Sequence, residues 1–182
     1  ASHTITIGSN FTANITGTLI YCTGTTINLT ATGGTSYLWS GPDGYAAAGA
    51  NLSRPGATTA MTGAYTVTVT NAGGCTATAT RNVTVHTLPT ATITGNNVIC
   101  AGTTLTLTAS GGTSYAWSGP GFSATTAVIN RTNATVAMSG TYSVTVTGTG
   151  GCKSTASMVV TVNTKPVVAI TGPASACNGS TL

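Results

Sequence analysis

Acidic side chains are almost absent from this chain of 182 residues. Asp43 is the only one, and charged residues make up 3% of the sequence, against roughly 25% in a typical soluble domain. The net charge of +4 therefore reflects missing acids rather than a basic patch, because the five cations are scattered: Arg54, Arg81, Arg131, Lys153 and Lys165. Nucleic-acid binding needs Lys and Arg clustered on one face, so we expect no nucleic-acid partner.

Catalytic and metal-binding groups are equally scarce. Acid–base catalysis needs a well-placed carboxylate or histidine, but Asp43 lies in a "GPDG" turn and the chain has only His3 and His86. Calcium sites need several carboxylate oxygens, and zinc sites need clustered Cys and His ligands. We therefore expect no enzyme activity, no metal and no cofactor.

Long hydrophobic runs are missing too, so no segment approaches the ~20 apolar residues of a membrane span. No signal peptide is visible, and we expect that any signal was removed or lies outside this sequence. Thr, Val and Ile are abundant, whereas a disordered chain would be poor in β-branched residues. The composition favours β-structure with a polar, uncharged surface.

A long internal repeat organises the chain. The segment "TATGGTSYLWSGP" at 30–42 matches "TASGGTSYAWSGP" at 108–120 at 11 of 13 positions. Trp39 and Trp117 are 78 residues apart, and so are Cys22 and Cys100. A period of this length suits a small β-domain repeated in tandem.

Apolar residues recur at every second position, which predicts strands rather than helices. In the second copy we expect strands at 90–94, 103–110, 114–118, 140–147 and 154–163, with shorter ones near 127–129 and 134–138. About seven short strands with Gly-rich turns predict an all-β fold of tandem antiparallel sandwiches.

The pattern "Y-x-W-S-G" followed by "G-x-Y-x-V-T-V" and "G-G-C" resembles tandem immunoglobulin-like (PKD-like) repeats. Such repeats occur in large secreted or cell-surface adhesin-type proteins of Bacteroidota. The resemblance covers nearly the whole chain and implies a core signature of Trp39, Tyr65, Trp117 and Tyr142. The sequence differs from antibody domains at two positions. Val67 and Val144 stand where those domains carry a cysteine of the bridge between the sheets.

Five cysteines allow several pairings. Because Cys22 and Cys75 recur as Cys100 and Cys152, we predict one bridge inside each copy, Cys22–Cys75 and Cys100–Cys152. The alternative is free buried thiols in a reducing compartment. Cys177 aligns as the first cysteine of a third unit, and its partner is expected beyond Leu182.

Three further sets of residues are candidate binding or modification sites. Arg54 and Arg131 are the only charges shared by both copies; we expect each to lie over an aromatic ring or to bond to carbonyls, with ligand contact as the alternative. Trp39 and Trp117 are expected in the core rather than as a sugar-stacking platform. Asn-x-Ser/Thr sequons that permit glycosylation begin at Asn10, Asn14, Asn28, Asn51, Asn82, Asn130, Asn133 and Asn178.

The alignment divides the chain into four parts. Residues 1–10 match the last strand of a preceding repeat, 11–88 and 89–165 are two immunoglobulin-like repeats, and 166–182 begin a third. The connections "HTLPT" (86–90) and "NTKPV" (163–167) are short and contain proline, which limits hinge motion. The expected partners are neighbouring repeats, or other copies in a filament.

These features favour a non-catalytic structural or adhesive segment of a long extracellular or cell-surface protein. It would serve as a stalk, a filament or an adhesin. The alternative is a set of spacer or carbohydrate-binding modules attached to a secreted hydrolase. A decoration of a phage virion is a third hypothesis.

Overall fold

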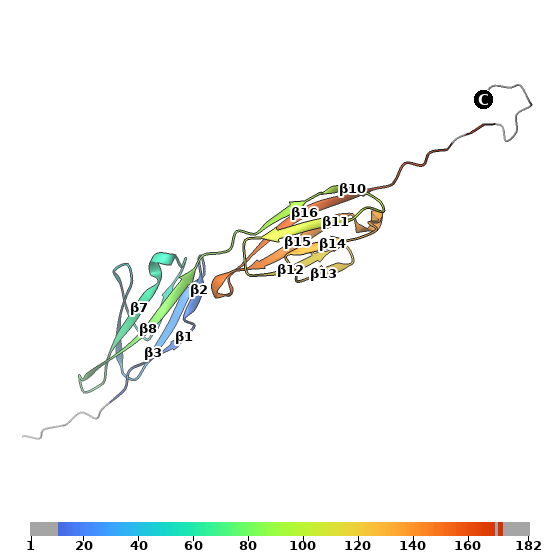
Figure 1. Ribbon diagram of the computed structural model, residues 1–182. Coiled ribbons are helices and arrows are strands. Elements are labelled where there is room, and N and C mark those ends of the chain that lie inside the picture. The colour runs from blue at the N-terminus through green and yellow to red at the C-terminus, as the bar shows by residue number, and fades with distance from the viewer. Residues whose placement is uncertain (1–10, 170, 173–182) are drawn as a thin grey trace, which may run out of the picture.

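The computed structural model describes residues 11–169, 171 and 172. Figure 1 shows two β-sandwiches arranged end to end along one line. Each sandwich packs a three-stranded sheet against a five-stranded sheet. No helix among these residues has both the length and the apolar character needed to cross a membrane.

The first sandwich combines the sheet β1-β3-β6 with the sheet β2-β8-β7-β4-β5. Its strands are β1 (Asn14–Gly17), β2 (Ile20–Cys22), β3 (Ile27–Thr32), β4 (Ser36–Gly41), β5 (Tyr45–Ala48), β6 (Asn51–Arg54), β7 (Gly63–Thr70) and β8 (Thr76–His86). A short 3-10 helix, η1 (Thr59–Met61), precedes β7.

The second sandwich repeats this topology, with the sheets β14-β11-β9 and β10-β16-β15-β12-β13. Its strands are β9 (Thr92–Gly95), β10 (Val98–Cys100), β11 (Leu105–Ser110), β12 (Ser114–Gly119), β13 (Phe122–Ala124), β14 (Val128–Arg131), β15 (Gly140–Thr147) and β16 (Lys153–Asn163). Two 3-10 helices, η2 (Val136–Met138) and η3 (Thr149–Gly151), flank β15.

Alternation along the strands builds one core in each sandwich. In β7 the side chains of Tyr65, Val67 and Val69 are fully buried, while the threonines between them lie on the other face. Val67 pairs with Trp39 across the sheet, so a valine packs beside the tryptophan where antibody domains place a cysteine. Burying each such aliphatic side chain contributes about 1.5–3 kcal/mol.

The first strand of each sandwich is divided between the two sheets. β1 pairs antiparallel with β3, and the chain then crosses so that β2 pairs parallel with β8. β9 and β10 do the same in the second sandwich. Each sandwich therefore has eight strands rather than about seven.

The strand expected near 134–138 is wrong. Asn133 adopts a positive φ of 53°, which turns the chain out of an extended path. Ala134 is buried and exchanges backbone hydrogen bonds with the loop at Gly102 and Thr103 instead of a neighbouring strand. η2 follows, and it leads directly into β15.

Candidate functional site: the junction between the sandwiches

The two shared arginines lie inside the sandwiches. Arg54 Nη1 donates to the carbonyl oxygen of Pro42 at 3.0 Å and to the hydroxyl of Tyr65 at 3.2 Å. Its guanidinium lies 4.8 Å from the centroid of the Tyr45 ring. The side chain is thus satisfied by internal partners and presents no charged surface for a ligand.

Arg131 repeats this arrangement in the second sandwich. Its Nη1 donates to the carbonyl oxygen of Pro120 at 3.0 Å and to the Tyr142 hydroxyl, and it lies over the Phe122 ring. Each tyrosine hydroxyl in turn donates to a carbonyl four residues upstream, Tyr65 to Met61 and Tyr142 to Met138, at 3.1 Å. This is the geometry of a tyrosine corner.

Close packing around these tyrosines explains the "W-S-G" part of the repeat. A Cβ atom added at Gly41 would lie 2.9 Å from the Tyr65 ring, and one at Gly119 would lie 2.7 Å from the Tyr142 ring. Only glycine lets the backbone approach the ring so closely.

The tryptophans are buried as well. Trp39 and Trp117 are 2% and 3% exposed, and their indole N–H groups donate to the carbonyls of Gly49 and Thr126, both at 2.9 Å. Neither ring face is open to a sugar. The sequon asparagines of the described residues are all exposed: Asn14, Asn28, Asn51, Asn82, Asn130 and Asn133. Asn10, Asn178, His3 and Cys177 lie outside the described residues.

The predicted cysteine pairing is wrong. Cys22 is bonded to Cys152, across the two sandwiches, and neither Cys75 nor Cys100 forms a disulfide with another of the described residues. Cys22 pairs with His86 at the end of β8, whereas Cys75 immediately precedes the start of that strand. Eleven residues of strand separate the two by roughly 35 Å, far beyond the ~4.4–6.8 Å between the Cα atoms of a disulfide.

The same reasoning excludes Cys100–Cys152. Cys100 pairs with Asn163 at the end of β16, and Cys152 precedes its first residue, Lys153. Each sandwich therefore carries one cysteine at each end. The end that bears Cys22 meets the end that bears Cys152.

We define the junction hairpin as residues 148–152, which connect β15 to β16. Cys152 is buried, and its Sγ lies 3.9 Å from the carbonyl oxygens of both Tyr21 and His86. A Cβ atom at Gly150 would lie only 2.1 Å from the His86 imidazole, so the glycine backbone packs directly on that ring. Gly150 also has a positive φ of 65°, which favours glycine there.

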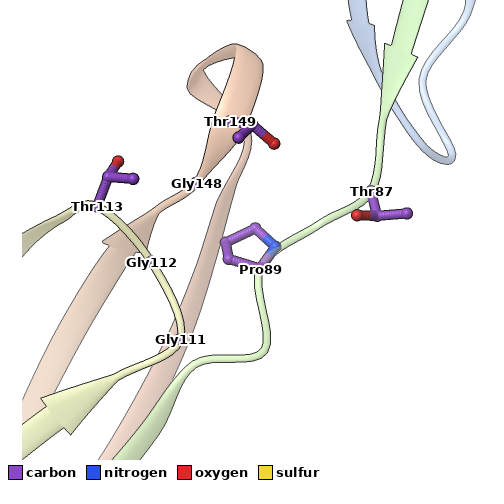
Figure 2. A pocket seen from close by; sticks show the side chains of 7 residues that line it. All are labelled: Thr87, Pro89, Gly111, Gly112, Thr113, Gly148 and Thr149. Atoms are coloured by element: carbon purple, nitrogen blue, oxygen red, sulfur yellow. The ribbon is translucent and has the colours of Figure 1, made fainter.

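The connection between the sandwiches passes beside this hairpin. Figure 2 shows Pro89 between the hairpin and the turn at 111–113, with Thr87 on the side of the first sandwich. The groove formed there has a volume of about 480 Å³ and is lined by uncharged residues: Thr87, Pro89, Gly111, Gly112, Thr113, Gly148 and Thr149. It contains no acid, base or nucleophilic thiol.

Sequence reasoning missed the residues that form this junction. On sequence grounds His86 is a candidate only as an acid–base group or a metal ligand, and the described residues contain no group of three or more His, Cys, Asp or Glu side chains that could hold a metal. The repeated "G-G-C" was the available signal, because it places a glycine at Gly150 two residues before Cys152.

Comparisons with known proteins agree with the architecture. No protein-family profile matches the sequence, and no curated protein matches it. Solved structures do match. A chain in "Marsupial T cell receptor" aligns with 13% identity and a TM-score of 0.55, covering 86% of this chain and 74% of that one.

Two other matches have similar coverage of this chain. The complex of the mouse coronavirus receptor-binding domain with its murine receptor gives 13% identity and a TM-score of 0.50, covering 82% of this chain and 99% of that one. The three N-terminal domains of the outer capsid protein Hoc of bacteriophage RB49 give 22% identity and a TM-score of 0.47. That match covers 84% of this chain, which spans 59% of the Hoc chain. The fold is therefore an immunoglobulin-like β-sandwich, present twice.

Proposed function

We propose that this chain is a non-catalytic structural segment of an extracellular tandem-repeat protein, in which consecutive immunoglobulin-like units form a stiff rod. The observation that carries the proposal is the Cys22–Cys152 bond between the two sandwiches. Residues 11–88 and 89–165 are the two repeats. Residues 1–10 and 166–182 belong to neighbouring ones.

Stiffness follows from two separate attachments between the units. Relative motion is the default for two domains that share a chain. Here the connection from His86 to Thr92 joins them on one path, and the disulfide joins them on another. Gly150 packs on His86 and Gly148 lies close to Pro89, which adds contacts beside these two attachments. A hinge would have to break these contacts while the disulfide holds both ends.

The same bond supports the extracellular location. Disulfides persist in oxidising environments such as the cell exterior, and the exposed sequons are compatible with a surface that carries glycans. The resemblance of the repeats to adhesin-type proteins of Bacteroidota supports a cell-surface stalk, filament or adhesin. The internal bonding of Arg54 and Arg131 supports a role in which these residues stabilise the fold rather than bind a ligand.

Small-angle scattering of the oxidised chain that carries Cys75→Ala, Cys100→Ala and Cys177→Ser, with and without the added pair Cys22→Ser and Cys152→Ser, tests this proposal. We expect the chain that keeps the Cys22–Cys152 bond to give a single extended particle with a narrow distribution of maximum dimensions. The variant should keep both sandwiches folded by circular dichroism but show a broader distribution. Equal flexibility in the two proteins would overturn the rod. Peptide mass mapping should also show that Cys22 and Cys152 resist alkylation until they are reduced.

A further inference from the structure

Two of the four cysteines in the described part of the chain have no disulfide partner, and they lie at opposite ends of the molecule. Cys75 lies between β7 and β8 in the first sandwich, and Cys100 ends β10 in the second. Both are exposed. In the repeat, Cys75 aligns with Cys152 and Cys100 aligns with Cys22. Cys152 and Cys22 form a disulfide where the two sandwiches are in contact.

Cys100 has the same backbone setting as Cys22, with Lys165 beside Gly102 where Gly24 has open space. Thr103 Oγ1 donates to the Cys100 carbonyl at 2.7 Å, just as Thr25 Oγ1 donates to the Cys22 carbonyl at 2.7 Å. Each cysteine ends a strand that runs parallel to the last strand of its sandwich. The end of the second sandwich therefore reproduces the Cys22 side of the junction, with Asn163 in place of His86.

Cys75 closes the corresponding hairpin of the first sandwich, although the turn differs. Asn71 Oδ1 accepts from the Gly73 and Cys75 N–H groups there, whereas the junction hairpin forms η3 with a positive φ at Gly150. We define the open hairpin as residues 71–75. Its first N–H, from Asn71, donates to the Cys75 carbonyl at 3.0 Å, and Gly148 makes the same bond to Cys152 at 2.8 Å. Gly73 stands where Gly150 stands in the junction hairpin. A Cβ at Gly73 would meet nothing closer than the Asn71 side chain at 3.4 Å, so this surface is uncovered.

We propose that Cys75 and Cys100 are the two halves of a second junction. Cys100 of one copy of this chain bonds to Cys75 of a second copy. The units would join head to tail, in the polarity of the Cys22–Cys152 junction. Because the two halves lie at opposite ends of the molecule, the contact does not close on itself and continues as a filament. This inference rests on the proposed function and adds the bond by which the rod is extended.

The bond forms by thiol–disulfide exchange. The Cys100 thiolate attacks a small disulfide such as oxidised glutathione, which gives a mixed disulfide and releases one glutathione thiolate. The Cys75 thiolate of the second unit then attacks the Cys100 sulfur and releases the second glutathione. One protein disulfide forms, two protein protons are lost, and one oxidised glutathione is reduced to two thiols.

Two complementary variants of the full chain test the proposal. Both carry Cys177→Ser; one also carries Cys75→Ala and the other Cys100→Ala. Each is first oxidised at Cys22–Cys152, and the two are then incubated in glutathione buffer, separately and as an equimolar mixture. We expect the mixture to give a heterodimer linked from Cys100 to Cys75, in about tenfold excess over the homodimer of either variant alone.

Two outcomes would overturn the proposal. Homodimers of either variant as abundant as the heterodimer would show random oxidation of exposed thiols. The absence of heterodimer, in chains whose Cys75 and Cys100 still react with iodoacetamide, would show that the two ends do not recognise each other. Either result leaves the scattering test of the monomeric rod unaffected, so failure of this inference is distinguishable from failure of the proposed function.

A substitution in the open hairpin separates recognition from mere thiol access. Gly73→Val in the Cys75-bearing variant should leave the monomer folded, since a Cβ there meets only the Asn71 side chain, at 3.4 Å. It should lower the yield of heterodimer about tenfold if this glycine packs on the partner as Gly150 does. Ala46→Val, at an exposed position in β5, is the matched control and should not change the yield. An unchanged yield with Gly73→Val would contradict the docking geometry.

Discussion

The two sandwiches have nearly identical cores and differ most at their hairpins between the last two strands. Cys152 is 1% exposed in the junction hairpin, whereas Cys75 is exposed in the open hairpin. Both hairpins close with the same backbone hydrogen bond. Cys152 is covered by the neighbouring sandwich, whose Tyr21 and His86 carbonyl oxygens lie 3.9 Å from its Sγ. The turns also differ, because Gly150 has a positive φ and Gly73 does not. The fold of each unit depends on contacts inside that unit, whereas burial and disulfide bonding of its cysteines depend on contact with another unit.

The largest expected effect tests whether the two cores are independent. Trp39→Ala removes a side chain that is 2% exposed and should destabilise the first sandwich by about 3–5 kcal/mol. Each sandwich has a single tryptophan, so the fluorescence of Trp117 then reports on the second sandwich alone. We expect its urea midpoint to stay unchanged, while calorimetry shows the other transition moving to lower temperature.

Trp117→Ala is the mirror control, with Trp39 as the remaining reporter. The Trp39→Ala variant could instead show a lowered urea midpoint for the Trp117 emission. That result would mean that the two sandwiches unfold as one cooperative unit. The comparison between two separate cores would then fail.

The strands and the fold class could be predicted from local patterns in the sequence, because these patterns depend on a single unit. The alternation of 140–147 matches β15, and the all-β sandwich class is confirmed by the strands and by the solved structures. The short edge strands β10 and β13 were missed, because each has three residues and too few alternations to stand out. Positive φ at Asn133 ended the strand that was expected at 134–138.

The cysteine pairing could not be derived from the same patterns. A period of 77–78 residues identifies Cys22 with Cys100 and Cys75 with Cys152. Equal spacing is satisfied both by a bridge inside each repeat and by a bridge from each repeat to the next. The choice depends on which end of β8 each cysteine occupies, and the length of that strand makes only the second geometry feasible.

A smaller effect is expected for a substitution at Gly150, the glycine of the junction hairpin that contacts His86. Gly150→Val would place a side chain against the His86 ring and force a strained positive φ, at a cost of about 1–3 kcal/mol. In a chain that lacks Cys75, Cys100 and Cys177, the Cys22–Cys152 bond should form about tenfold less favourably. A glutathione redox titration followed by intact mass measures this ratio.

Gly73→Val in the same background is the matched control, because Gly73 has no neighbouring sandwich against it. We expect it to leave the redox equilibrium of Cys22–Cys152 unchanged. Equal behaviour of the two variants would mean that the contact of Gly150 with His86 contributes nothing to closing the junction.

The smallest expected effect concerns the one ion pair in the described part of the chain. Asp43 lies 3.4 Å from Arg54, but its side chain is 67% exposed, and exposed pairs contribute about 0–1 kcal/mol. The second sandwich has Gly121 in place of this aspartate. Screening by salt weakens an exposed pair, so raising the NaCl concentration should slightly lower the stability of the first sandwich and not that of the second.

Asp43→Asn isolates this charge, because asparagine also tolerates the positive φ of 62° at this position. The variant should lose less than about 1 kcal/mol, and its first sandwich should become as insensitive to NaCl as the second. Urea unfolding at low and high NaCl, with Trp39 as reporter in a Trp117→Phe background, measures the first sandwich. The Trp39→Phe background measures the second. A larger loss would show that the carboxylate positions Arg54 over the Tyr45 ring, so that the two arginine sites are not equivalent after all.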